Sequence, residues 1–145
     1  MSGTGTAGQT PSTTATRRRT LGIALWVLQA LLALQFAMAG LAKVFGSPAM
    51  VEMFAIIGIG QWFRYVVGAL ELAGAVGVLI PWLSGLAALG LVGLMAGATL
   101  TNVLVLDTSP LLPIVLFVVS SMVAWGRWPR TRTLFTNREA GRRLQ

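Results

Sequence analysis

Four long apolar runs follow one another through this chain of 145 residues and leave little room for a soluble fold. At about 1.5 Å per residue, each of the first three is long enough to cross a hydrocarbon core of ~30 Å as a helix. The fourth crosses only if it extends toward Trp128 or if the bilayer thins around it. We therefore predict an all-α membrane protein, a four-transmembrane-helix bundle over residues 21–128. Its spans are expected at about 21–42, 62–80, 82–106 and 111–128.

The net charge of +7 is carried by the ends of the chain, beside a composition that is 55% hydrophobic and only 10% charged. Arg17–Arg19 precede the first run, and six arginines follow the last: Arg127, Arg130, Arg132, Arg138, Arg142 and Arg143. Basic flanks set topology and attract anionic lipids, so this charge indicates a bilayer partner and no nucleic acid. With four spans, both termini are expected on the cytoplasmic side of a bacterial plasma (inner) membrane.

The segments outside the runs divide into two tails and one long connection. We expect residues 1–20 to be a disordered cytoplasmic tail, because residues 1–16 are mostly Gly, Ser and Thr. We expect residues 129–145 to be a basic cytoplasmic tail. In the connection 43–61, Ser47-Pro48 is a typical helix start, and Gly58 and Gly60 can act as hinges. The sequence thus predicts a short interfacial helix between the first two spans, at Ala49–Ile57.

One alternative concerns the N-terminus. Arg17–Arg19, the apolar stretch after them and Ala37-Met38-Ala39 together imitate a secretory signal peptide. The apolar run of about twenty residues is longer than the usual signal core, which favours a retained span. A mature protein that begins at Gly40 would contradict the four-span prediction.

Polar side chains inside the spans are the candidate functional residues. Glu71 lies midway along the second run, where a carboxylate costs about 2.5–3.5 kcal/mol and by default indicates a function. Counted from the cytoplasmic ends, Glu71 lies about 14 Å deep, Gln29 about 12 Å and Lys43 about 33 Å. Gln29 is therefore the expected neighbour, and an ion pair with Lys43 is not. The full candidate intramembrane site is Glu71, Gln29, Arg64, Gln35, Thr99 and Asn102. The alternative interpretation is that Glu71 only joins helices, as a protonated acid bonded to Gln29 or a backbone carbonyl.

Small residues at four-residue spacing suggest where the helices approach closely. They occur at Ala69, Ala73 and Gly77 in the second span, and at Gly93, Gly97 and Thr101 in the third. We favour packing of these two spans against each other, and a homo-oligomer through one of the faces stays open.

The chain has no cysteine and no histidine. It therefore lacks the residues that most often bind metals, haem and iron–sulfur clusters, and the usual nucleophile–base pairs. We predict no metal site and no enzyme that works by itself. Redox chemistry would need a bound organic carrier or a partner subunit.

Two motifs with their separation give the chain a family resemblance. Gly40-Leu41-Ala42-Lys43 closes the first span, and Gly68-Ala69-Leu70-Glu71-Leu72-Ala73-Gly74 lies in the second. Over residues 21–130 the chain resembles the DoxX/DoxX-like family of small bacterial four-helix membrane proteins. The resemblance assigns Gly40, Lys43, Gly68, Glu71 and Gly74 to the family pattern. It also implies a link to quinone-dependent redox systems and to membrane complexes of oxidative-stress defence.

Three functions follow as alternatives. The first is an accessory or quinone-interacting subunit of a membrane redox system, with a quinone as the one expected cofactor and a redox protein as partner. The second is a transporter of protons or a small solute that titrates Glu71, which the absence of an internal inverted repeat disfavours. The third is a scaffolding membrane protein in which Glu71 serves packing alone.

Overall fold

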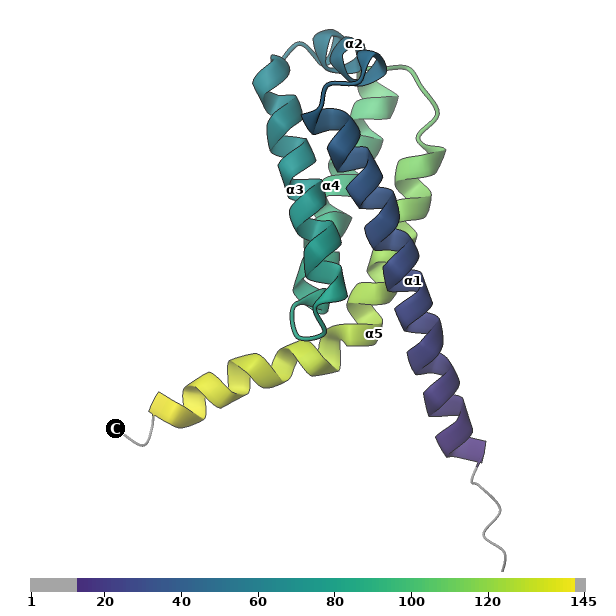
Figure 1. Cartoon of the computed structure of the whole chain (residues 1–145), viewed down its shortest axis with the longest axis vertical. Helices are drawn as coiled ribbons and strands as arrows, with labels where there is room; N and C mark the ends of the chain where they lie inside the picture. Colours follow the sequence, from purple (N-terminus) through teal and green to yellow (C-terminus); the bar gives the residue numbers. More distant parts are fainter. Residues whose placement is uncertain (1–12, 143–145) are drawn as a thin grey trace, which may run out of the picture.

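The computed structural model describes residues 13–142, and this part of the chain folds into five α-helices without strands. The helices are α1 (Thr13–Val44), α2 (Pro48–Ile57), α3 (Gln61–Leu79), α4 (Ser84–Leu104) and α5 (Leu111–Arg142). Figure 1 shows α1, α3, α4 and α5 side by side as a bundle, with α2 lying across one end. We call this the α2 end. The opposite end, where α1 enters and α5 leaves the bundle, is the arginine end.

The four-span prediction is confirmed. Long apolar windows lie in α1 (Arg19–Val44), α3 (Gln61–Leu79), α4 (Ser84–Leu104) and α5 (Leu111–Pro129). At most a third of the residues in any window is buried inside the bundle. The remaining apolar surface has to face lipid, because no soluble protein leaves this much of it in water. The chain is therefore a multi-pass membrane protein.

The short helix between the first two spans is also confirmed, as α2. Pro48 occupies its first position, where the missing N–H costs nothing, although the Ser47 side chain makes no capping hydrogen bond. Gly58 ends the helix in the left-handed conformation (φ 78°), and its N–H donates to the Phe54 carbonyl at 3.3 Å. Phe54 is the buried residue of α2 and packs against Phe63 of α3.

The bundle consists of two close pairs, α1 with α3 and α4 with α5. The hydrophobic core joins the two pairs, with Leu32 of α1, Val78 of α3, Leu91 of α4 and Val123 of α5 each at most 2% exposed. Ala87 and Leu91 of α4 meet Gly77 and Gly74 of α3, toward the arginine end. Nearer the α2 end, a cavity takes the place of the core.

Two glycines bring α1 and α3 into close contact and fix their register. A Cβ atom on Gly40 would lie 2.9 Å from the carbonyl oxygen of Gly68, and one on Gly68 would lie 3.0 Å from that of Gly40. The backbones therefore touch at this level, as small residues allow in membrane helices. The same register of α1 and α3 holds toward the arginine end, where Gln29 of α1 donates a hydrogen bond to the Val78 carbonyl of α3 at 2.7 Å.

The predicted packing of α3 against α4 through two small-residue faces is wrong in part. Gly77 does pack against α4, but Ala69 and Ala73 are exposed. On α4, Gly93 and Gly97 are exposed, and a Cβ atom on either would meet nothing within 4 Å. This part of the α4 face is therefore open and does not pack against α3.

The chain ends extend beyond the bundle. α5 bends where it leaves the arginine end (Figure 1), and Pro129 lies inside the helix there. Proline removes one backbone hydrogen bond and clashes with the preceding turn, which kinks a helix. Residues 1–12 of the predicted N-terminal tail lie outside the described residues. The side chains of residues 130–145, and so most of the predicted basic tail, also lie outside them.

Candidate functional site

Glu71 forms an ion pair with Lys43, so the prediction that places it beside Gln29 is wrong. The Lys43 ammonium donates to both carboxylate oxygens, at 3.0 Å to Oε1 and 2.9 Å to Oε2. The Glu71 side chain is only 4% exposed and that of Lys43 only 13%. Two opposite charges thus meet in a low-dielectric part of the bundle, where either charge would be strongly destabilising without its partner.

The helix register and the tilt of the side chains together explain the pair. With Gly40 level with Gly68, Lys43 lies three residues beyond this level toward the α2 end, and Glu71 three residues toward the arginine end. Their Cα atoms are thus about 9 Å apart along the bundle axis. Side chains tilt toward the N-terminus of their own helix, and α1 and α3 are antiparallel. The two side chains therefore lean toward each other and close the gap.

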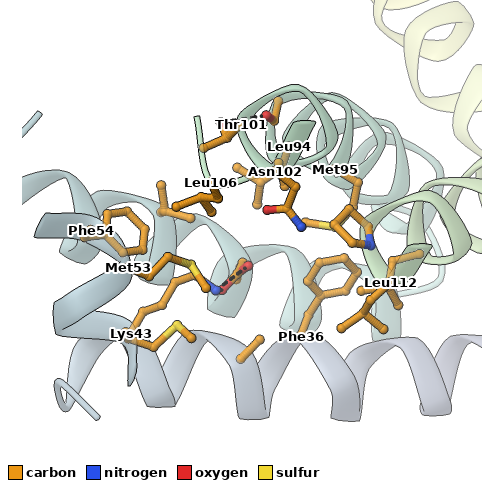
Figure 2. A pocket seen from close by; sticks show the side chains of 18 of the residues that line it. Phe36, Lys43, Met53, Phe54, Leu94, Met95, Thr101, Asn102, Leu106 and Leu112 are labelled. Atoms are coloured by element: carbon orange, nitrogen blue, oxygen red, sulfur yellow. Dashed lines mark hydrogen bonds and ion pairs between the residues drawn. The ribbon is translucent and has the colours of Figure 1, made fainter. Parts of the chain in front are cut away.

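The ion pair forms part of the wall of a cavity of about 520 Å³ near the α2 end. All five helices contribute to it, among them Phe36 from α1, Met53 and Phe54 from α2, Val67 from α3, and Leu112 from α5. Figure 2 shows the ring of Phe36 and the side chain of Lys43 rising from α1 toward Leu94, Met95 and Asn102 of α4. The volume lies in the range of small-molecule sites, and the lining is mostly apolar.

A few polar side chains interrupt this apolar lining. Beside Lys43 and Glu71, the wall includes Gln35 of α1 and Thr101 and Asn102 of α4. Asn102 donates one amide hydrogen to the Ser109 carbonyl at 3.2 Å, which leaves its second N–H for another acceptor. A mostly apolar space with a few placed donors is typical of a site that orients a small molecule.

Arg64 is buried but does not line the cavity. Its guanidinium donates to the Lys43 carbonyl and to Gln61 Oε1 (3.0 Å), and it lies 4.4 Å from the centre of the Tyr65 ring. The last carbonyls of a helix lack partners and carry partial negative charge, so a cation there stabilises the end of α1. Gly46 follows with φ 71°, and a Cβ atom there would lie 3.1 Å from the guanidinium. Arg64 thus holds the backbone of the residue whose side chain pairs with Glu71.

Gln29 belongs to a second buried network, at the arginine end. Its Oε1 accepts from Nε of Arg127 at 2.9 Å and also from a terminal nitrogen of that guanidinium. Arg127 lies 5.6 Å from the ring centre of Trp26 and is 3% exposed, although the sequence places it in a basic flank. With the bond from Gln29 to Val78, this network joins α1, α3 and α5.

The structure therefore divides the six candidate site residues into separate groups. Glu71, Gln35 and Asn102 line the cavity, while Gln29 and Arg64 lie in other networks. Thr99 donates to the Met95 carbonyl of its own helix at 2.8 Å. Lys43 also lines the cavity, although the depths counted from the sequence excluded it as a partner of Glu71. Its position in the Gly40–Lys43 motif is the sequence feature that indicates a site residue. The glycines of the motifs serve packing: Gly40 and Gly68 meet each other, and Gly74 meets Leu91.

Comparison with known proteins decides the family. The model of the DoxX-like family matches residues 27–123, a stretch that contains α2, α3 and α4 whole and most of the membrane-spanning parts of α1 and α5. The chain belongs to the DoxX-like family. The matched stretch of this DoxX-like protein includes the cavity and the Lys43–Glu71 pair. Neither the curated proteins nor the solved structures contain a match.

Proposed function

We propose that this DoxX-like protein binds a membrane quinone in the cavity at the α2 end, as an accessory subunit of a membrane redox system. The observation that carries the proposal is the pairing of a largely apolar, ligand-sized space with a charged donor in its wall. Lys43 has three N–H donors, and the two carboxylate oxygens of Glu71 engage at most two of them. A donor thus stays free for an acceptor inside the cavity.

The chemistry of the lining matches a quinone head better than a charged solute. A quinone carbonyl only accepts hydrogen bonds, and the wall offers donors in the Lys43 ammonium and the amides of Gln35 and Asn102. Phe36 and Phe54 present aromatic rings to the same space, where an offset stack with a flat ring is favourable. A quinone supplies the electron-carrying group that the chain itself lacks, and a partner subunit supplies the second redox centre.

Lys43→Met is expected to weaken quinone binding strongly. The variant removes a hydrogen bond to a charged donor, worth about 1.5–3 kcal/mol, so the Kd should rise roughly 10- to 150-fold. The measurement is titration of the purified protein in lipid nanodiscs with decylubiquinone, followed by ligand-induced thermal stabilisation, which grows with ligand concentration over Kd. Native mass spectrometry of the same preparation reports bound quinone and any copurified redox protein.

Two further variants separate binding from folding. Thr99→Val alters a polar residue of α4 that bonds within its own helix, so its Kd should equal that of the unmodified protein. Glu71→Gln keeps an acceptor for Lys43 and should fold, but it holds the ammonium less firmly and should bind decylubiquinone more weakly. Glu71→Gln with unchanged affinity would favour a purely structural ion pair. Absence of quinone binding by the unmodified protein would refute the proposal.

We also infer that both chain ends lie on the cytoplasmic side of a bacterial plasma membrane. Support comes from the basic residues at the arginine end, among them Arg17, Arg19 and Arg127, whereas those toward the α2 end are Lys43 and Arg64, which form hydrogen bonds within the bundle. Positive charge is retained on the cytoplasmic side. Fluorescent-protein and alkaline-phosphatase fusions at the C-terminus check this: fluorescence without phosphatase activity is expected, and the reverse result would invert the topology.

A further inference from the structure

The cavity has an exposed edge on α4. Gly93 and Gly97 both line the cavity and are both exposed on the surface of the bundle. A Cβ atom on either would meet nothing within 4 Å. A residue that belongs to the cavity wall and to the outer surface at once marks a place where the cavity communicates with the surroundings.

The divergence of α3 and α4 produces this edge. Toward the arginine end the two helices are in contact, since a Cβ atom on Gly74 would lie 2.4 Å from Leu91. Toward the α2 end, Val67 and Glu71 of α3 and Gly97 of α4 are all part of the cavity wall, so the space between the helices belongs to the cavity. This part of the bundle lies within the apolar windows of both helices, where the surroundings are lipid.

We propose that the gap between α3 and α4 at Gly93 and Gly97 is a lateral portal, through which a lipid-dissolved amphiphile enters the cavity from the bilayer and in which its hydrocarbon tail stays. The proposal rests on the proposed function for the identity of the head, but the portal itself rests on geometry. A tail in the gap touches the lipid on one side and apolar helix surface on the other. The polar head then reaches Lys43 without either part of the molecule crossing water.

The missing side chains at Gly93 and Gly97 keep the portal wide. Glycine in a helix interior costs about 0.5–1 kcal/mol relative to alanine. Neither glycine has a close neighbour that a larger side chain would displace, so helix packing does not explain why glycine occupies these positions. Gly90 lies on the same face, also exposed and with no neighbour within 4 Å, but it does not line the cavity. It provides a matched control position on the same helix.

A single introduced cysteine tests the portal without reference to quinone, since the chain has no native cysteine. Ala98→Cys places a thiol in the cavity wall, and N-dodecylmaleimide dissolved in the nanodisc lipid serves as the probe. We expect Ala98→Cys to be labelled. Leucine at both Gly93 and Gly97 should slow the labelling roughly tenfold, equivalent to about 1.4 kcal/mol, because the two side chains occupy the gap that the reagent has to cross. Gly90→Leu in the same background should leave the rate unchanged.

Titration of the leucine variants with two quinones then tests the tail. For the Gly93→Leu/Gly97→Leu protein, the Kd for decylubiquinone should rise roughly tenfold, and the Kd for the tail-less dimethoxy-methyl-benzoquinone head should change less than about twofold. Equal labelling rates in all variants, or no labelling of Ala98→Cys, would overturn the portal. The portal would also be overturned if the leucine variants changed from dimer to monomer while their labelling was unaffected. The Gly93–Gly97 face would then be an interface with a second copy of the chain. Portal-dependent labelling without any quinone binding would leave the portal in place and refute the proposed function.

Discussion

Gly40→Val is expected to destabilise the bundle by about 1–3 kcal/mol, the usual cost of forcing extra atoms into a packed interior. The new Cβ would lie 2.9 Å from the Gly68 carbonyl oxygen and 2.8 Å from Cγ of Leu72. Leu72 can change rotamer, but a backbone carbonyl can move only with its helix. The valine therefore separates α1 from α3 at the point that fixes their register. Unfolding in mixed detergent micelles, followed by circular dichroism, measures the change.

Gly22→Val is the matched control for this substitution. Gly22 lies in the same helix and has no neighbour within 4 Å of a built Cβ, so the unfolding free energy should change little. If Gly40→Val were as stable as Gly22→Val, the close contact between α1 and α3 could not be what sets the register. If the proposed function holds, the Gly40 variant should also lose quinone binding, because Lys43 and Glu71 no longer meet.

The ion pair predicts strong non-additivity in a double-mutant cycle. Lys43→Met leaves the Glu71 carboxylate without its cation in a site where only 4% of the side chain is exposed, and removal of one partner of a buried pair costs about 3–5 kcal/mol. Lys43→Met combined with Glu71→Leu removes both charges, and similar replacements are often neutral. The double variant should therefore be more stable than Lys43→Met alone.

The cycle uses the same micelle unfolding, with each variant measured at one detergent composition. Because each single replacement should cost about 3–5 kcal/mol and the double replacement little, the coupling energy should exceed the roughly 0.5–3 kcal/mol that is usual for residues in direct contact. Gln29→Leu combined with Lys43→Met provides the contrast, since Gln29 bonds to Arg127 and Val78 in the other network and should give additive effects. Additivity for Lys43 and Glu71 would mean that the pair contributes nothing to stability. Coupling between Gln29 and Lys43 would mean that the two networks are one.

The helices could be predicted from the sequence because hydropathy and turn residues act locally. The four spans follow from run length, and α2 follows from Ser47-Pro48 before an apolar stretch that ends at Gly58. The candidate site could be predicted only as a set of polar residues. The depths counted from the sequence assume that Leu21 and Ile80, the arginine-end limits of the first and second spans, lie at the same height in the membrane. With Gly40 level with Gly68, Ile80 is level with Leu28, so the count misplaces one helix by about 10.5 Å.

The remaining differences share this physical origin. Register depends on contacts between helices, such as those of Gly40 and Gly68, which hydropathy does not contain. Arg127 has the sequence context of a flanking charge, yet it is buried because Gln29 and Trp26 surround its guanidinium. Gly93 and Gly97 have the spacing of a packing face, yet no other helix in the described part of the chain packs against them.

The Gly40–Gly68 register also bears on how the chain is made. A ribosome delivers α1 to the bilayer before α3, so Lys43 is already near the α2 end when the segment with Glu71 enters. An unpaired acid at mid-span costs about 2.5–3.5 kcal/mol on insertion, and an ammonium within reach offsets that cost as soon as the two helices touch. Arg64, on the same incoming helix, then closes over the end of α1. The order of synthesis thus places the cation in the membrane ahead of the acid that needs it.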